Sequence, residues 1–344
     1  MRRLGRGKQE KTWISVYQGM AAARTEVEER MLEAGRIVGK YEIVRPLGAG
    51  GEGCVYLAED SVLLRPVALK RIGEESTWDA AVEKGAGNVE RKAGNAAGKT
   101  GEAAEEAVLR EAGFLRDLQH PMLPVVYDLF YRDGWYLVME YIEGVSLHNY
   151  IAKTGIVEEE QGRVWAEALL SIMEYLHTRK PPVIYRDLKP ENIMVCADKS
   201  LRLVDLGAAW RKGYGGDTDG RMALTPGYGA PEQFGKGRKA YADERSDIFA
   251  LGRVLYYMLT GADPGKPPYG SLPIRVYHPL LGDDLESVIQ KCTRESPGER
   301  YQMVEEIRRD LSVQGARKRR RRRENFLRHM EKKVWLTQKR TVGL

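Results

Sequence analysis

The stretch VIYRDLKPENIM occupies residues 183–194, and two shorter stretches follow it, Asp205-Leu206-Gly207 and Ala230-Pro231-Glu232. Polar side chains are interspersed with apolar ones in the first stretch, at Asp187, Lys189 and Asn192. Asp205 follows thirteen residues after Asn192. A single Asp in such a place is most simply explained as the cap of a turn. Four polar side chains at one ordered spacing instead indicate a site that carries chemistry.

A glycine-rich stretch lies upstream, between runs of alternating residues that predict antiparallel strands. Glycines there let backbone N–H groups approach phosphates with no Cβ in the way. A dinucleotide-binding turn would use the same letters, but it requires a helix directly after the glycines, and CVYLAED continues as a strand. The predicted phosphate-binding residues are Gly48, Ala49, Gly50, Gly51, Glu52, Gly53 and Val55.

The strand predicted after this loop carries Lys70, in the run Val67-Ala68-Leu69-Lys70. One lysine in a strand is ordinarily a solvated edge charge. Residues 105–119 predict an amphipathic helix, and Glu111 on it could present a carboxylate to Lys70. Such an ion pair would hold the ammonium toward the α- and β-phosphates of a nucleotide.

These signatures, five in order over about 185 residues, resemble those of the protein kinase family. The sequence is most similar to bacterial eukaryotic-like (Hanks-type) serine/threonine kinases. The resemblance implies an α+β, bilobal protein-kinase-like fold, with a small antiparallel-sheet N-lobe that has one main helix and a larger, mainly helical C-lobe. A ligand would then bind in the cleft between the lobes. The expected kinase domain is 41–313, with an N-lobe over 41–139, a hinge over 140–144 and a C-lobe over 145–313.

The remaining segments differ in composition from this domain. Residues 1–40 predict a loosely structured basic leader, and 314–344 a basic tail. Residues 73–106 are rich in Ala, Gly, Glu and Lys and predict a low-complexity insertion that contributes little core. Within it, AGNAAGKT is not a phosphate loop, because Ala93 stands where that motif needs glycine.

The resemblance implies that the protein transfers the γ-phosphoryl group of ATP to Ser or Thr hydroxyls of proteins. Asp187 would accept the hydroxyl proton, and Lys189 would lie over the γ-phosphate. Asn192 and Asp205 would be oxygen ligands of Mg²⁺. Thr225 is expected to contact Lys189, an arrangement typical of serine/threonine specificity.

The resemblance also implies an adenine pocket and a structural ion pair. Backbone groups of the hinge would bind the adenine, which lies between apolar side chains that could equally be ordinary core. Glu232 is expected to pair with Arg300. The predicted pocket residues are Met139, Glu140, Ile142, Val55, Ala68 and Met194.

Three departures from the family pattern are Tyr185, Leu206 and Leu224, of which the first two fill packing positions. A pseudokinase or ATP-binding scaffold is the alternative function. The complete set of polar residues favours an active kinase. A small-molecule kinase is disfavoured by the segment 205–232, which offers a platform for a protein substrate.

The formal charge of the chain is +6. This positive charge comes from the two ends, because the leader has 9 basic against 5 acidic side chains and the tail has 12 against 2. Residues 41–313 carry a net charge of −8. Residues 317–336 therefore predict either a solvated end or a basic amphipathic segment at an anionic membrane surface; nucleic acid is a weaker alternative. The three cysteines fit no disulfide or zinc spacing and suggest a reducing compartment. We expect a cytoplasmic protein, with the tail as its contact to the inner face of a membrane.

Arg186 directly precedes Asp187, and in kinases with this arrangement the arginine binds an anionic partner from the activation segment. Between Asp205 and Glu232 the hydroxyl side chains other than tyrosines are Thr218 and Thr225. The sequence predicts Thr218 as a site of regulatory autophosphorylation, because a phosphate there could reach Arg186. The alternative is a flexible acidic loop with no regulatory role.

Overall fold

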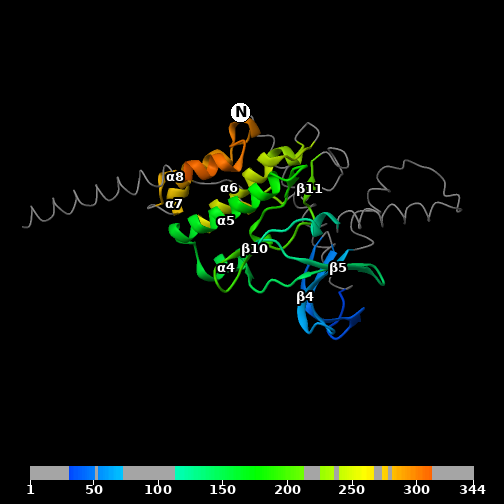
Figure 1. The fold of residues 1–344 in the computed structure, drawn as a ribbon. Helices are drawn as coiled ribbons and strands as arrows, with labels where there is room; N and C mark the ends of the chain where they lie inside the picture. The colour runs from blue at the N-terminus through cyan, green and yellow to red at the C-terminus, as the bar shows by residue number, and fades with distance from the viewer. Residues whose placement is uncertain are drawn as a thin grey trace, which may run out of the picture. The chain divides into compact units, whose positions relative to one another are not determined.

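The computed structural model describes residues 31–50, 53–72, 113–212, 225–235, 240–266, 273–277 and 281–311. The chain divides into a first unit, Met1–Glu143, and a second unit, Gly144–Leu344 (Figure 1). This division falls inside the predicted hinge. The predicted insertion 73–106 and tail 314–344 lie outside the described residues.

The first unit contains an antiparallel sheet of six strands in the order β1-β2-β3-β4-β6-β5. Of the predicted helix, 113–116 is described as helical, and Leu115 and Leu118 are buried as its periodicity indicates. The strands are β1 (Ile37–Val38), β2 (Tyr41–Gly50), β3 (Gly53–Asp60), β4 (Arg65–Ile72), β5 (Val126–Tyr131) and β6 (Trp135–Glu140).

The register of this sheet puts the predicted nucleotide-binding side chains on one face. Lys70 lies opposite Val55, and Ala68 lies opposite Met139. Residues opposite each other in antiparallel strands share a face, and so do residues two apart on one strand. The other face forms the core of the unit, whose fully buried members include Tyr56, Val67, Leu69, Tyr136 and Val138.

The end of the predicted leader packs onto this sheet. β1 pairs with β2, and the side chains of Leu32 and Val38 belong to the buried core. The backbone N–H of Leu32 also donates to the Tyr56 hydroxyl at 3.2 Å. The prediction that the leader is loosely structured as far as residue 40 was thus wrong for residues 31–40. A strand of two residues is too short to show a period in the sequence.

The second unit is mainly helical, and its long helices α5 and α6 lie side by side (Figure 1). The 3.6-residue periodicity of the sequence predicts helices over 147–153, 158–178, 247–260 and 283–292. The observed helices agree with these segments to within three residues at each end. A helix also covers residues 304–311. The helices are α4 (Leu147–Thr154), α5 (Glu159–His177), α6 (Glu244–Thr260), α7 (Ile274–Tyr277) and α8 (Asp283–Cys292).

Short strands and 3₁₀ turns connect these helices, and Asp187 and Lys189 lie in the loop between Ile184 and the turn that begins at Pro190. β9 pairs with β10 and with β7, and β11 pairs with β8. The strands are β7 (Val145–Ser146), β8 (Val183–Ile184), β9 (Ile193–Val195), β10 (Leu201–Leu203) and β11 (Trp210–Arg211). The 3₁₀ turns are Pro190–Asn192, Pro231–Phe234 and Pro297–Glu299.

Helix α6 packs closely against α8 because Gly252 has no side chain. A Cβ at this position would lie 2.6 Å from the Cβ of Cys292 and 2.8 Å from the Cγ2 of Thr293. The helix begins three residues earlier than its apolar period predicts, since Asp243 caps it by accepting from the Arg245 N–H at 2.9 Å.

Candidate active site

Three side chains of the second unit donate hydrogen bonds to the carboxylate of Asp187. Lys189 Nζ donates to Asp187 Oδ2 at 2.5 Å, and the Thr225 hydroxyl donates to Oδ1 at 2.7 Å. Asn192 Nδ2 donates to Oδ2 at 3.0 Å and to the backbone carbonyl of Asp187 at 2.9 Å. Lys189 Nζ also lies 3.3 Å from the Thr225 Oγ1, which confirms the predicted contact. A carboxylate that is 9% exposed is thereby held in one orientation.

The backbone of this loop is fixed by Asp247, which the sequence analysis did not single out. Its two carboxylate oxygens accept the N–H groups of Tyr185 and Arg186, each at 2.8 Å. His177 Nε2 lies 2.9 Å from Asp247 Oδ2. Asp247 is fully buried on α6. The sequence does indicate this residue, because a charged side chain in the otherwise apolar run SDIFALG is rarely buried without partners.

Arg186 has an unusual backbone and a buried side chain. Its φ is +68°, in the left-handed region, and its carbonyl accepts from Gln233 Nε2 at 3.1 Å. Gln233 in turn accepts the Ala230 N–H at 2.8 Å through Oε1. The guanidinium of Arg186 lies over the Trp210 ring, 4.5 Å from its centroid. Thr218 lies outside the described residues.

The two predicted metal ligands flank the same end of the β9–β10 hairpin. Ile193 pairs with Leu203, and the Val204 N–H donates to the Asn192 carbonyl at 3.1 Å. Asp205 directly follows Val204, so this pairing brings Asp205 close to Asn192. Because the Asn192 amide nitrogen donates to Asp187, its amide oxygen is the group that could bind a metal. Asp205 Oδ1 accepts the Gly207 N–H at 3.1 Å.

A metal held here would need further oxygen ligands. Among the described residues, no group of three or more His, Cys, Asp or Glu side chains could hold a metal ion. Mg²⁺ is commonly bound by one or two carboxylates together with phosphate oxygens of the substrate. An amide oxygen beside a carboxylate fits that mode of binding.

The first unit carries the other part of the predicted set. The N–H of Glu140 donates to the Val125 carbonyl at 2.8 Å. The backbone group of Glu140 that could still bind adenine is therefore its carbonyl. Met139 and Ile142 are buried, and Gly53 has a φ of +121° in the glycine hairpin. Gly51, Glu52 and Glu111 lie outside the described residues, so the predicted Lys70–Glu111 pair stays a prediction.

The predicted pairing of Glu232 with Arg300 is confirmed. Arg300 Nη1 and Nη2 donate to the two oxygens of Glu232 at 2.7 and 2.8 Å. The remaining donors of the guanidinium reach the backbone carbonyls of Arg245, Glu295 and Arg294 at 2.9, 2.9 and 2.7 Å. All five N–H groups of a buried guanidinium are therefore satisfied.

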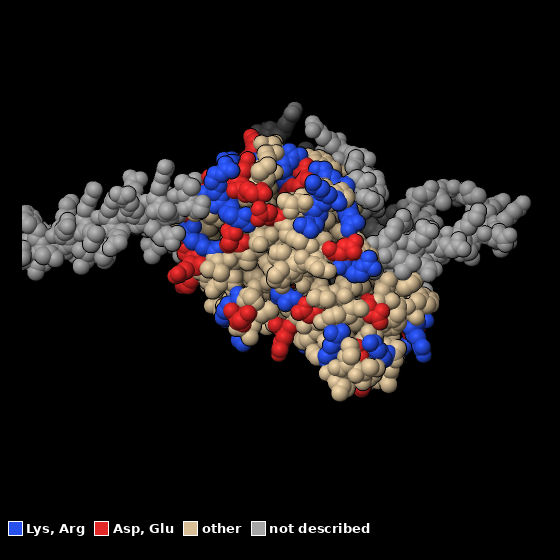
Figure 2. Space-filling model, viewed as in Figure 1, with Lys and Arg blue, Asp and Glu red and all other residues tan. Residues whose placement is uncertain are grey.

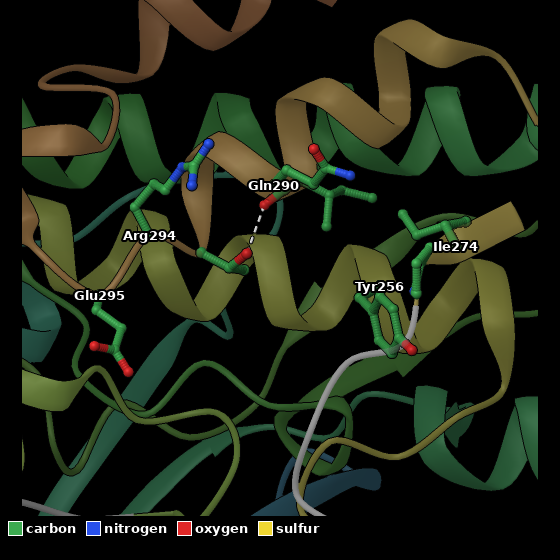
Figure 3. A pocket seen from close by; sticks show the side chains of 8 residues that line it. Tyr256, Ile274, Gln290, Arg294 and Glu295 are labelled. Atoms are coloured by element: carbon green, nitrogen blue, oxygen red, sulfur yellow. Dashed lines mark hydrogen bonds between the residues drawn. The ribbon is translucent and has the colours of Figure 1, made fainter. Parts of the chain in front are cut away.

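A pocket of about 360 Å³ opens elsewhere in the second unit, between α6, α7 and α8 (Figure 3). Its lining mixes apolar side chains with the polar ends of Gln290, Arg294 and Glu295. None of the residues predicted to bind ATP, metal or the acceptor lines this pocket. It therefore adds nothing to the site around Asp187.

The protein kinase domain family matches residues 41–309 of this chain. The chain belongs to the protein kinase family. The match covers both units, and it includes the glycine hairpin, Lys70, the loop around Asp187 and the Glu232–Arg300 pair.

Bacterial serine/threonine-protein kinases are among the kinases that this chain resembles. It is 30% identical to PrkC of Bacillus subtilis (strain 168) over 296 residues, which cover 82% of the chain and 42% of PrkC. It is 30% identical to PknD of Chlamydia caviae over 312 residues, which cover 79% of the chain and 31% of PknD. The chain thus spans less than half the length of these relatives.

Solved structures share the fold. The kinase domain of PknI from Mycobacterium tuberculosis matches with a TM-score of 0.58 and 22% identity, over 83% of this chain and 100% of that one. The apo form of PpkA-294 matches with a TM-score of 0.61 and 23% identity, over 82% and 99% of the two chains. The predicted α+β protein-kinase fold is confirmed.

The described helices contain none with the length and apolar character that crossing a bilayer requires. On the face drawn in Figure 2, Lys and Arg side chains are interspersed with Asp and Glu side chains. That face therefore does not present a surface of a single sign.

Proposed function

We propose that this kinase is an active serine/threonine protein kinase that transfers the γ-phosphoryl group of ATP to protein hydroxyls. The observation that supports this proposal is the set of contacts at Asp187, where lysine, threonine and asparagine side chains all contact one carboxylate. A pseudokinase that serves as a binding scaffold has no need of a carboxylate held in this way.

The transfer requires an acceptor hydroxyl to be oriented and to lose its proton. Asp187 is the base in this proposal, and it takes the proton as the oxygen of the hydroxyl attacks the phosphorus. Lys189, which donates to Asp187, would neutralise negative charge on the transferred group. Since phosphoryl transfer has a loose transition state, positioning and charge neutralisation are the main contributions of the protein.

Members of this family use ATP and a divalent metal ion, and the residues present fit both groups. Asn192 and Asp205 would hold Mg²⁺, which neutralises phosphate charge when it is bound. The glycine hairpin 48–53 and Lys70 would hold the phosphates of ATP. Backbone groups of Glu140 and Ile142 would hold the adenine, with Val55, Ala68, Met139 and Met194 as its apolar surroundings.

The test compares the wild type with Lys70→Ala and Asp187→Asn in the presence of radiolabelled ATP, Mg²⁺ and dephosphorylated casein. Both substitutions should abolish the transfer while leaving the protein folded, as a cooperative thermal unfolding transition would show, because both side chains serve charge placement in the site. Equal incorporation of phosphate by the wild type and both variants would rule out the active kinase and leave the scaffold function.

Regulation by autophosphorylation of Thr218 is part of the proposal. A phosphate there would add about −1.5 to −2 charge and could bind the guanidinium of Arg186. Thr218→Ala should lower activity several-fold without loss of ATP binding. Mass spectrometry of the active enzyme that finds Thr218 unmodified, together with full activity of the variant, would exclude this regulation.

The basic segment 317–336 is proposed to bind anionic membrane surfaces from the cytoplasmic side. Each basic residue near such a surface contributes roughly 1 kcal/mol at low salt. Sedimentation with phosphatidylserine vesicles should fall steeply as salt rises and on deletion of 317–344. Binding that is indifferent to lipid charge would exclude this role.

A further inference from the structure

Trp210 lies where the loop that carries Asp187 meets the start of the activation segment. It belongs to β11, which pairs with β8 so that Trp210 lies opposite Ile184. Two residues after Ile184, the chain reaches Arg186, whose guanidinium lies over the indole at 4.5 Å from the ring centroid. Both side chains are buried, with 5% of Arg186 and 9% of Trp210 exposed.

The backbone of Arg186 is held in a conformation that a non-glycine residue rarely adopts. Its φ is +68°, and such a conformation persists only where the surroundings enforce it. The N–H of Arg186 is fixed by Asp247, and its carbonyl is fixed by Gln233. The contact with Trp210 fixes the side chain of Arg186. The N–H, the carbonyl and the side chain of the residue directly before Asp187 are therefore all held in place.

The chemistry of the pair suits this role. Indole is the aromatic ring that attracts cations best, and a guanidinium can stack on its face while its N–H groups point outward in the plane. Stacking in a buried place also offsets part of the cost of removing the charge from water. A leucine at this position could fill much of the volume but could not attract the cation.

We propose that Trp210 is a positioning residue of the phosphotransfer reaction, which acts by holding Arg186 and, through its backbone, the orientation of Asp187. This proposal rests on the proposed kinase function. Trp210 does not touch the reacting groups in this scheme. Its loss should therefore lower kcat and leave the KM for ATP almost unchanged.

The experiment uses the full chain with Trp210→Phe, Trp210→Leu and Arg186→Lys. We expect Trp210→Leu to lower kcat with casein about tenfold, while Trp210→Phe, which keeps an aromatic face, retains kcat within about threefold. Arg186→Lys replaces the planar guanidinium and should resemble Trp210→Leu. Trp135→Leu makes the same exchange on β6 of the first unit and serves as the matched control, with kcat unchanged.

A second measurement needs no ATP and does not depend on the proposed function. Amide hydrogen exchange of residues 184–187 should be faster in Trp210→Leu than in the wild type and unchanged in Trp210→Phe. If the wild type transfers no more phosphate than Asp187→Asn, the kinase function fails, but the exchange rates still decide whether Trp210 holds this loop.

Three results would overturn the proposal. The first is equal loss of kcat in the Phe and Leu variants with an equal drop in thermal stability, which indicates ordinary packing. The second is wild-type kcat and exchange in Trp210→Leu. The third is a double variant, Trp210→Leu with Arg186→Lys, whose loss of kcat equals the product of the fold-losses of the two single variants. Two residues that act through one contact should instead lose little more together than either loses alone.

Discussion

At the scale of single residues, the contacts of Asp187 suggest where an acceptor hydroxyl binds. An ionised carboxylate has about four acceptor directions, two on each oxygen. Among the described residues, Lys189 and Asn192 donate to Oδ2, whereas Oδ1 receives the Thr225 hydroxyl. We expect the acceptor hydroxyl to approach Oδ1, next to Thr225.

Thr225 is therefore the residue whose substitution tests this arrangement. Thr225→Ala should lower kcat roughly 10- to 100-fold, because a hydrogen bond to a charged group contributes about 1.5–3 kcal/mol. Thr225→Ser keeps the hydroxyl and should retain most of the activity. Steady-state kinetics with casein measure both variants, and equal kcat for Ala and Ser would contradict a role for the hydroxyl.

The sequence predicted the residues at Asp187 but not those that hold the loop behind it. Lys189, Asn192 and Thr225 were predicted because each lies at a fixed position in a motif. Asp247 accepts N–H groups more than 60 positions away in the chain, and no local pattern encodes which distant groups a buried carboxylate binds. Trp210 was missed because a lone tryptophan after Asp205-Leu206-Gly207 has no periodicity to place it.

At the scale of elements, α6 joins the loop around Asp187 to the end of the activation segment. Asp247, in its first turns, holds the backbone of the loop. Ser246 donates to Glu232 at 2.8 Å, and the Arg245 carbonyl accepts from Arg300. The first two turns of this helix therefore anchor both segments, and the cap at Asp243 determines where those turns begin.

The charge of Asp243 should make part of the stability depend on pH. Although burial raises the pKa of Asp243, side-chain and backbone hydrogen bonds from Arg245 outweigh it and hold the pKa below the usual 3.8. A pKa that is lower in the folded state gives stability that is fully present above about 3.8 and is lost as the pH falls through the folded value.

Asp243→Asn is the matched variant, since asparagine also caps helices but carries no charge. The difference in free energy of unfolding between the wild type and Asp243→Asn should be constant from pH 7 to pH 5 and shrink below pH 4. Urea denaturation at each pH measures this difference. A difference that grows on acidification would have the wrong sign for a lowered pKa.

The pair of Glu232 and Arg300 should contribute strongly to the folded state of the second unit. Their side chains are 5% and 0% exposed, and removing one partner would leave a buried charge without its counterion. Glu232→Gln or Arg300→Met should each destabilise the protein by about 3–5 kcal/mol in chemical denaturation.

A control for this prediction is the more exposed arginine Arg308, which binds Glu167 and Glu174. Arg308→Met should cost no more than about 1 kcal/mol, because exposed ion pairs contribute little. Comparable losses for Arg300→Met and Arg308→Met would show that burial does not determine the energy of these pairs.

At the scale of the whole molecule, the predicted division into a sheet-rich and a helical part was confirmed because period-2 and period-3.6 patterns occur in separate halves of the chain. The packing of residues 32–38 onto the sheet was not predicted, since Leu32 and Val38 are isolated apolar residues in a polar context. The fold and the contacts within the loop around Asp187 were thus accessible from sequence, whereas most contacts between distant segments were not.

The insertion 73–106 gives the last prediction. It has almost no large apolar residues, and the predicted nucleotide-binding residues of the first unit lie at positions 48–70 and 139–142, outside the insertion. Deleting residues 76–102 should therefore leave the affinity for ATP within about twofold and the unfolding temperature nearly unchanged, because little apolar surface is lost. Isothermal titration with ATP and calorimetry measure both quantities. As a control, residues 76–102 are replaced by a Gly/Ser linker of equal length, which preserves the spacing of the ends. A large drop in unfolding temperature for both variants would show that the insertion is a packed element, and a drop for the deletion alone would show that the spacing is what the fold requires.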